Sequence, residues 1–161
     1  MNKLKISFLI WMLMVSVSVF ADYAPANVQA ALKKIYPTAD DIAWSRDEGY
    51  YVADFMMNGF DTKVWFNSEA QWVMKQTDWV TMDEVPPPAV YNAFAASQYS
   101  GEMVQNVTWV QFPEWQAIVA VEVGMANLQT KYQILFTPNG EILRVRNVTY
   151  TYNPLGASTF L

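Results

Sequence analysis

The chain contains neither histidine nor cysteine among its 161 residues. Without histidine there are no imidazole metal ligands and no nucleophiles activated by a histidine base. Without cysteine there are no thiol nucleophiles, and no disulfide can form in any compartment. Glycine-rich phosphate loops and the spaced acidic loops of calcium sites are also missing. The sequence therefore predicts a protein that is not an enzyme and that holds neither a metal nor a cofactor.

A serine–lysine dyad is a hydrolase arrangement that this composition still allows. However, no serine stands in a Ser-x-x-Lys or nucleophile-elbow pattern. The acidic pairs Asp40-Asp41 and Asp83-Glu84 are adjacent residues in predicted loops, where neighbouring side chains diverge. We expect both pairs to face solvent, which makes a hydrolase the least favoured function.

The first 21 residues have the pattern of an export signal. Lys3 and Lys5 give a short positive start, residues 6–20 are apolar apart from three serines, and Val19-Phe20-Ala21 suits signal peptidase. We predict cleavage after Ala21 and a periplasmic or secreted location in a bacterium. The alternative is an uncleaved membrane anchor, but the apolar run is shorter than the roughly 20 residues that span a bilayer comfortably. We expect no stable membrane span after cleavage.

Acidic residues outnumber basic ones, 15 to 10, so the full chain has a net charge of −5. Loss of Lys3 and Lys5 with the signal leaves 8 basic and 15 acidic residues, a net charge of −7. An acidic protein repels the phosphate backbone of nucleic acids. We therefore expect no nucleic acid partner.

Hydrophobic periodicity predicts two helices and eight strands. Each helix has apolar residues spaced by three and four positions and opens at prolines, which suit a first helical turn. The predicted helices are Pro25–Ile35 and Ala89–Gln98. Alternating apolar residues and Asn-Gly turns predict antiparallel hairpins. The predicted strands are 42–46, 50–57, 62–67 and 72–76, followed by 106–112, 115–123, 131–136 and 142–148.

The two halves carry the same elements in the same order, at an offset that grows slowly. Val28 matches Val90 at an offset of 62, and Phe66 matches Phe136 at an offset of 70. This pattern predicts a duplicated unit with loop insertions; coincidence among abundant aromatic residues is the alternative. The predicted domains are a signal peptide at 1–21, repeats at 22–80 and 81–149, and a C-terminal tail at 150–161 that lies along the sheet.

The predicted fold class is α+β. Two tandem α-β4 repeats form one antiparallel sheet, and the helices pack on one face of it. Alternation along the hairpins divides the side chains between the two faces. The row expected to pack on the helices is Tyr51, Ala53, Phe55, Val64, Phe66, Tyr132, Ile134 and Phe136. The opposite row includes Val52, Asp54, Lys63, Trp65, Gln133 and Leu135, with Arg144 and Arg146 nearby.

A series of ordered motifs gives the chain a family resemblance. The residues are Pro25, Val28, Tyr36-Pro37, Ile42, Trp44, Tyr51, Ala53, Phe55, Phe66-Asn67, Trp72, Thr77 and Val85 to Val90. Over about residues 24–148 the chain resembles the PepSY-like, β-lactamase-inhibitor-like (BLIP-like) family of secreted bacterial proteins. The resemblance implies helices on one face of a continuous antiparallel sheet, with the other face open.

Members that inhibit β-lactamases lay a concave, aromatic-rich sheet face over a protruding loop of the enzyme. Those inhibitors carry disulfides, which this chain lacks, and no segment of it matches an inhibitory loop. The resemblance therefore implies a binding surface, and β-lactamase inhibition is not carried over to this chain.

Trp65 is the most informative residue of the predicted open face. Its neighbour Phe66 suits the core, so Trp65 should point away from the helices and be exposed. Exposed tryptophan and arginine are residue types that anchor protein interfaces. The alternative is that the tryptophans only pack against the sheet. The candidate partner-binding residues are Trp65, Lys63, Asp54, Trp72, Trp109, Trp115, Arg144 and Arg146.

These observations predict an exported, non-catalytic binding or inhibitory module. It would engage a protein or peptide of the cell envelope through the open, aromatic-containing sheet face. The alternative function is binding of a small apolar ligand between the sheet and the loop Gly124–Thr130.

Overall fold

A computed structural model describes residues 24–79, 81–82, 87–124 and 129–161. The predicted signal peptide at 1–21 therefore lies outside the described residues. Within these ranges, no helix combines the length and the apolar character needed to cross a membrane.

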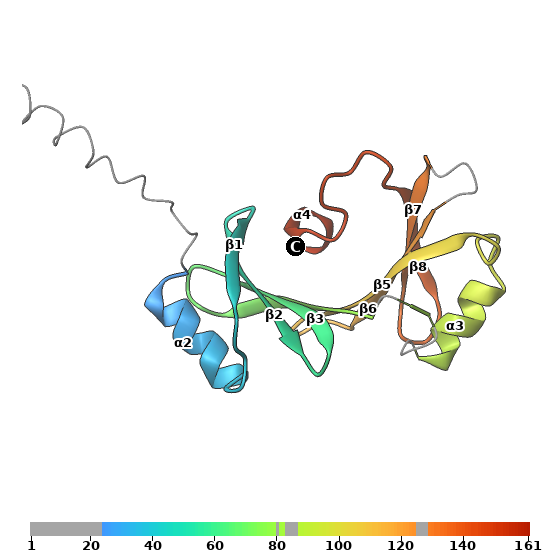
Figure 1. The fold of residues 1–161 in the computed structure, drawn as a ribbon. Coiled ribbons are helices and arrows are strands. Elements are labelled where there is room, and N and C mark those ends of the chain that lie inside the picture. The colour runs from blue at the N-terminus through green and yellow to red at the C-terminus, as the bar shows by residue number, and fades with distance from the viewer. Residues whose placement is uncertain (1–23, 80, 83–86, 125–128) are drawn as a thin grey trace, which may run out of the picture.

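Eight antiparallel strands form one sheet in which each strand pairs with its neighbours in sequence (Figure 1). The strands are β1 (Ala43–Asp47), β2 (Tyr50–Met57), β3 (Phe60–Phe66), β4 (Trp72–Asp78), β5 (Met103–Gln111), β6 (Ile118–Gly124), β7 (Lys131–Phe136) and β8 (Ile142–Asn147). The bounds of β2 and β7 match the predicted ranges, and the other strands differ from them at their ends. The largest differences at a strand start are in β5, which begins three residues early, and in β6, which begins three residues late because an irregular loop follows Pro113.

Tight turns join the strands of the first hairpins. Glu48 and Gly49, between β1 and β2, have φ angles of 49° and 95°, and Asn58 and Gly59, between β2 and β3, have 54° and 85°. Two successive residues with positive φ are what a two-residue hairpin turn requires, and glycine and asparagine adopt this geometry readily. The hairpin that the Asn-Gly signal predicted between β2 and β3 is therefore confirmed.

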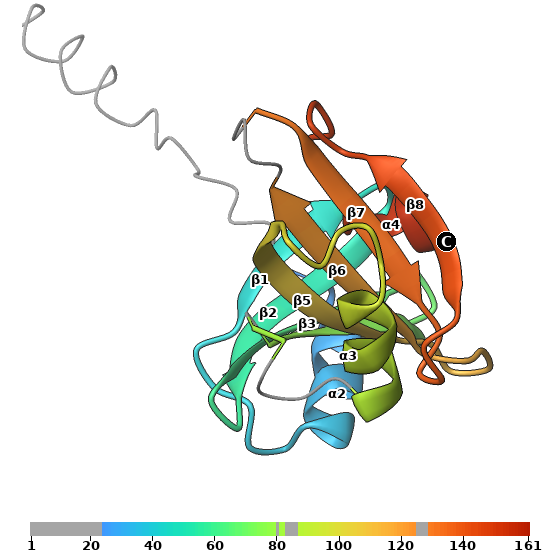
Figure 2. The same ribbon diagram turned by 90° about the vertical axis from the view of Figure 1, so that its right-hand side faces the viewer.

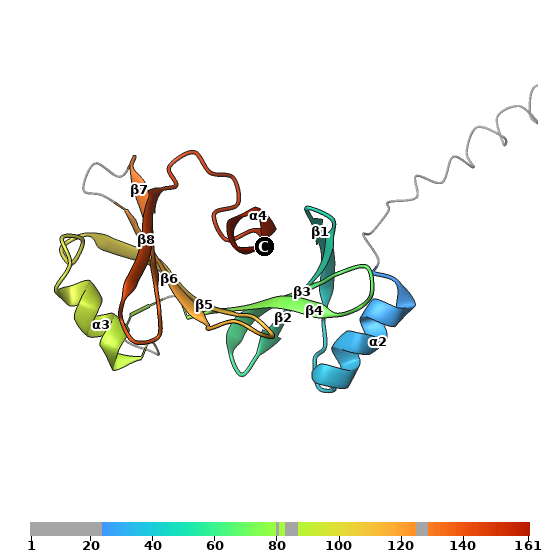
Figure 3. The same cartoon turned by 180° about the vertical axis from the view of Figure 1, so that it is seen from behind.

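Helix α2 (Ala26–Ile35) packs on the convex face of the sheet (Figures 1 and 3). It buries Val28 and Leu32 against residues of β2 and β3, including Val64 and Phe66. The spacing of Val28 and Leu32 puts both side chains on one helix face, as the periodicity predicted. Lys33 and Lys34 occupy the last turn, where positive charge favours the helix dipole.

Helix α3 (Pro88–Ala95) packs on the same convex face, over the second half of the sheet (Figures 1 and 3). It buries Val90 and Phe94 in a second cluster with residues of β5, β6 and β7. Pro87 and Pro88 stand at the start of the helix, where a missing N–H costs nothing. The predicted helix-facing row is confirmed, since every member belongs to one of the two clusters or packs against it.

The β3–β4 and β7–β8 connections have the same geometry. In each, the N–H of the first loop residue, Asn67 or Thr137, donates to the carbonyl four residues later, at 3.0 and 2.8 Å. Ala70 and Gly140 occupy the same loop position and have φ angles of 63° and 85°. A shift in strand register follows each loop. These matches support the predicted duplication, which stays a prediction.

The concave face is not open at its centre. The chain folds back after β8, and helix α4 (Ala157–Phe160) lies in the trough of the sheet (Figures 1 and 3). Ala157 is buried there in a third cluster with Val52, Trp65, Met74, Val110 and Phe112. The tail lies against the sheet as predicted, but the expectation of an open face is wrong at this place. Burial of this apolar patch away from water is the physical reason.

The sheet twists strongly from end to end. Figure 2 shows β7 and β8 running at a wide angle to β1 and β2. Such a twist accumulates from strand to strand because each strand has a right-handed twist of its own. The twist curves the sheet into the trough that receives the C-terminal segment.

Phe66→Ala and Phe136→Ala test the two convex clusters. Both side chains are fully buried at matching positions, so each substitution should lower the free energy of unfolding by about 3–5 kcal/mol. Urea unfolding followed by circular dichroism measures it. Tyr152→Ala, at a fully exposed side chain, should change it by less than about 0.5 kcal/mol. Very different losses at the two phenylalanines would contradict the equivalence of the clusters.

Candidate binding groove on the concave face

A polar groove lies between the concave face and the C-terminal residues 151–158, with a volume of about 780 Å³. We call it the concave groove. Its walls come from β1 to β6 and from the C-terminal segment, and six carboxylates face two cationic side chains. The charged lining residues are Asp47, Glu48, Asp54, Asp61, Asp78 and Glu122, with Arg46 and Lys63. The groove is therefore strongly acidic.

Strand register explains why the groove lies beside the third apolar cluster. Val52, Trp65 and Met74 are paired across β2, β3 and β4 and form an apolar row. Two residues further along each strand, on the same face, the next row is Asp54, Lys63 and Gln76. The row after that is Asp61, Asp78 and Thr108. The concave face thus changes from apolar to polar over two residues along each strand.

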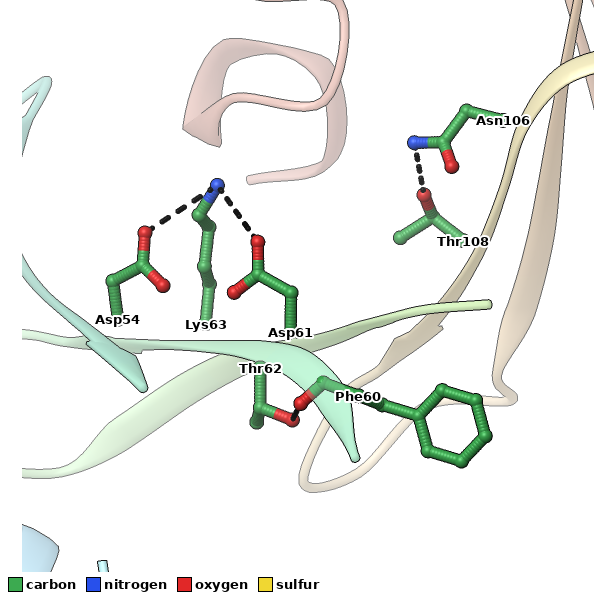
Figure 4. A network of polar contacts seen from close by, with 7 residues as sticks. All are labelled: Asp54, Phe60, Asp61, Thr62, Lys63, Asn106 and Thr108. Atoms are coloured by element: carbon green, nitrogen blue, oxygen red, sulfur yellow. Dashed lines mark hydrogen bonds and ion pairs between the residues drawn. The ribbon is translucent and has the colours of Figure 1, made fainter. Parts of the chain in front are cut away.

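Lys63 lies between two carboxylates on the groove floor (Figure 4). Its Nζ is 3.5 Å from Asp54 Oδ2 and 4.0 Å from Asp61 Oδ2. The three side chains are between 38% and 46% exposed. Ion pairs with this much solvent contact are worth little, so groups of a ligand can compete for these charges.

Two carboxylates of like charge stand side by side at one end of the groove. Asp61 stands directly opposite Asp78 in the β3–β4 register, and like charges in this position destabilise a sheet. Beyond them, β5 contributes Asn106, whose Nδ2 donates to Thr108 Oγ1 at 3.3 Å (Figure 4). This end of the groove suits ligands that donate hydrogen bonds or carry positive charge.

Two groove carboxyls are displaced from their ordinary titration range. Burial raises the pKa of Asp54, its hydrogen bond with Asp61 raises it further, and the charge of Lys63 lowers it. Burial also raises the pKa of Glu122, against the hydrogen bond that it accepts from Gln133 at 3.2 Å. Both charged forms are thus disfavoured by burial, and a bound positive group would relieve that cost.

Side-chain amides and a guanidinium group hold the C-terminal segment over the sheet. Gln76 Nε2 donates to Leu155 O at 2.5 Å, and Gln133 Nε2 donates to Pro154 O at 3.0 Å. Arg146 donates from Nε to Gln133 Oε1 at 2.8 Å and from Nη2 to Pro154 O. Because Gln76 and Gln133 are themselves buried, these bonds are shielded from water and define where the segment lies.

Asp47 joins the third apolar cluster to helix α4. Its Oδ2 accepts hydrogen bonds from Trp65 Nε1 and from the Ala157 backbone N–H, each at 2.8 Å. Trp65 therefore points away from α2 and α3, as predicted, but it is only 3% exposed. The expectation of an exposed Trp65 is wrong because the C-terminal segment covers its indole ring.

The remaining tryptophans named in the sequence analysis do not meet in one site. Trp72 packs against the first convex cluster and Trp109 against the second. The Trp109 ring centroid lies 5.3 Å from that of Trp79. Trp115 is 68% exposed and, with Trp72, lines a separate hollow of about 760 Å³ near the end of α2. The idea of one aromatic docking face is therefore wrong.

The charged candidates are also divided between places. Asp54 and Lys63 line the concave groove. Arg146 is half-buried and holds the C-terminal segment, whereas Arg144 is exposed on β8. Alternation could have added Asp61, which stands two residues before Lys63 on the same face. No pattern in the sequence marks Asp47, whose partner Ala157 is 110 residues away.

Within the described residues, no cluster of three or more aspartates and glutamates is arranged to hold a metal ion. The groove offers hydrogen bonding and charge, supplied by carboxylates, amides, hydroxyls, Arg46 and Lys63.

The chain belongs to the family described as "Putative beta-lactamase-inhibitor-like, PepSY-like", whose sequence pattern matches residues 49–144. The resemblance seen in the sequence is thereby confirmed. A search of curated proteins finds no match.

Three solved structures of similar chains come from Bacteroides species. A DUF2874 family protein from Bacteroides uniformis has 84% identity and a TM-score of 0.85, covering 86% of this chain and 100% of its own. A protein from Bacteroides eggerthii described as a putative periplasmic protein has 71% identity and a TM-score of 0.83, covering 86% and 99%. A BLIP-like protein from Bacteroides fragilis has 35% identity and a TM-score of 0.71, covering 79% and 89%.

Asp47→Ala tests the connection between Trp65 and α4. The change leaves the buried indole N–H without its acceptor and should lower the free energy of unfolding by about 1–3 kcal/mol. Urea unfolding with tryptophan fluorescence measures the loss. Asp47→Asn keeps an acceptor oxygen and should recover most of it. If Asp47→Ala were as stable as the wild type, this contact would not secure the segment.

Glu122→Gln tests the effect of the buried carboxyl on stability. A pKa raised by folding adds stability below the ordinary carboxyl range, and that stability is lost as the pH rises through the folded-state pKa. The variant should therefore unfold at a higher temperature than the wild type at pH 7, and the difference should shrink towards pH 4. Scanning calorimetry across this range measures it. Glu69→Gln, in an exposed loop, controls for the loss of one charge; an equal effect there would refute the role of burial.

Proposed function

We propose that the protein is an exported, non-catalytic binding module that holds a segment of another cell-envelope protein in the concave groove. The observation that carries this proposal is the acidic groove of about 780 Å³, which several strands and the C-terminal segment line together. Its long polar rows extend across neighbouring strands, which suits an extended chain better than a compact small molecule.

The charge of the groove indicates which segment it would hold. Six carboxylates against two cationic groups favour a peptide that carries lysine or arginine. Such a side chain would relieve the opposition of Asp61 and Asp78 and would pair with carboxyls whose charge burial disfavours. The amide and hydroxyl groups of Asn106 and Thr108 would add hydrogen bonds to the backbone of the peptide.

The similar proteins support two parts of this proposal, the periplasmic location and the non-catalytic character. The family is named for its likeness to an inhibitor, and inhibitors act by binding. The Bacteroides eggerthii relative is described as periplasmic, in line with the export signal predicted at 1–21. We extend both properties to this chain as part of the proposal, and we do not extend to it the inhibition of a β-lactamase.

The apolar-ligand alternative places its site between the sheet and the loop Gly124–Thr130. Residues 125–128 of that loop lie outside the described residues, so this alternative stays a prediction.

Asp61→Lys tests the groove directly, because it reverses the charge on its floor. Tagged wild type and variant are incubated with envelope extract from a Bacteroides species, and proteins retained at physiological salt are identified by mass spectrometry. We expect a partner that is retained by the wild type and at least ~10-fold depleted on the variant, since like charges across an interface are strongly unfavourable.

Glu69→Lys is the matched control. It changes the net charge by the same amount on an exposed loop outside the groove, and it should retain the partner like the wild type. Equal recovery of every protein by all three forms would reject the groove as the binding site.

A further inference from the structure

Strand β8 forms one edge of the sheet, with β7 on one side and no strand on the other (Figure 1). Among the described residues, no hydrogen bond joins another segment to the outer side of its backbone between Ile142 and Asn147. A free strand edge presents a row of unpaired N–H and C=O groups, and proteins normally blunt or cover it.

The register identifies which backbone groups point outward. Val148 N–H donates to Lys131 O at 2.9 Å, so this pair is of the hydrogen-bonded kind. Hydrogen-bonded pairs alternate along an antiparallel ladder, which makes Gln133–Arg146 the next pair of that kind. The N–H and C=O of Val145, between these positions, therefore point away from β7 and are available to another strand.

Exposed apolar side chains distinguish this edge from the opposite one. Ile142, Leu143 and Val145 are 44%, 51% and 37% exposed, whereas β1 exposes no large hydrophobic side chain. Val145 stands opposite the buried Ile134 and thus continues the apolar convex face outward. Exposed hydrophobic residues gathered on a free edge are typical of a surface that another chain covers.

The charge of the β8 edge favours one kind of binding partner over another. β8 carries two of the three arginines of an acidic protein. Arg146 is engaged by Gln133 and Pro154, but Arg144 is exposed and has no ion pair within the described part of the chain. A second copy pairing through β8 would bring four arginines together, which is unfavourable. A strand with acidic side chains on that face would complement them.

We propose that β8 binds an extended acidic segment of another protein as a ninth strand of the sheet. The backbone of Val145 supplies the outward hydrogen bonds, and Arg144 pairs with an acidic side chain of the segment. Apolar residues at the alternate positions of the segment lie over Val145 and Ile142. This surface is separate from the concave groove and does not depend on its function.

The probe is the peptide Thr-Glu-Val-Glu-Val-Glu-Thr-amide with fluorescein attached to its N-terminal amine, titrated with the full mature chain and followed by anisotropy. Val145→Pro removes the outward N–H, which has no partner in the free protein, and proline is tolerated on edge strands. We expect it to weaken binding at least ~10-fold, because proline blocks the ladder. Val145→Thr keeps the N–H and the branched shape and should bind within about twofold of the wild type.

Arg144→Glu gives a second, independent readout should Val145→Pro not fold. We expect at least ~5-fold weaker binding of the acidic probe, and tighter binding of the same peptide with lysine in place of glutamate. Circular dichroism verifies the fold of each variant. The proposal is overturned if the wild type does not bind the acidic probe, or if both variants bind it as the wild type does. A peptide-free dimer that Val145→Pro disperses would also overturn it, since the occupant would then be a second copy.

Discussion

A single antiparallel sheet has two faces, and two short helices can cover only one of them. In this protein α2 and α3 bury the convex face, each over one hydrophobic cluster. The concave face still carries an apolar row around Trp65, so something else must shield it from water. The chain provides that cover itself, by folding its last residues back into the trough. The position of this C-terminal segment determines which residues of the concave face remain accessible as the groove.

The C-terminal segment is held mainly through polar contacts around a small apolar centre. Asp47, Gln76 and Arg146 reach it from β1, β4 and β8, so its position is tied to the whole width of the sheet. Buried hydrogen bonds of this kind fix one geometry, because an unpaired group would carry a desolvation cost. The segment covers the apolar row and leaves the two polar rows beside it as the walls and floor of a groove.

The protein thus offers two surfaces of opposite character. The concave groove is acidic and lined by side chains, whereas the outer edge of β8 is basic and offers backbone hydrogen bonds. The convex face is occupied by the helices and serves stability. If both proposals hold, the protein would bind two different segments, one across the trough and one along the edge.

Local patterns determined the sheet and its two rows of side chains. Alternation placed Phe66 and Phe136 in the core and turned Trp65 and Lys63 to the other side, because the strand repeat of two is a property of the backbone. Helix periodicity and the flanking prolines located α2 and α3, and the Asn-Gly turn set the β2–β3 hairpin. The order of these motifs was specific enough to identify the family. The duplication rests on the same patterns and on the matching loops, and it stays a prediction.

Only the tertiary structure decided which part of the concave face is exposed. Whether Trp65 meets solvent or α4 depends on Asp47 and Ala157, which are 110 residues apart and show no common pattern. Helix α4 has only four residues, too few for periodicity to reveal it, and the tail is ordered by contacts with β1, β4, β7 and β8 together. Side-chain direction is a local property of a strand, but burial depends on what the rest of the chain brings to that strand.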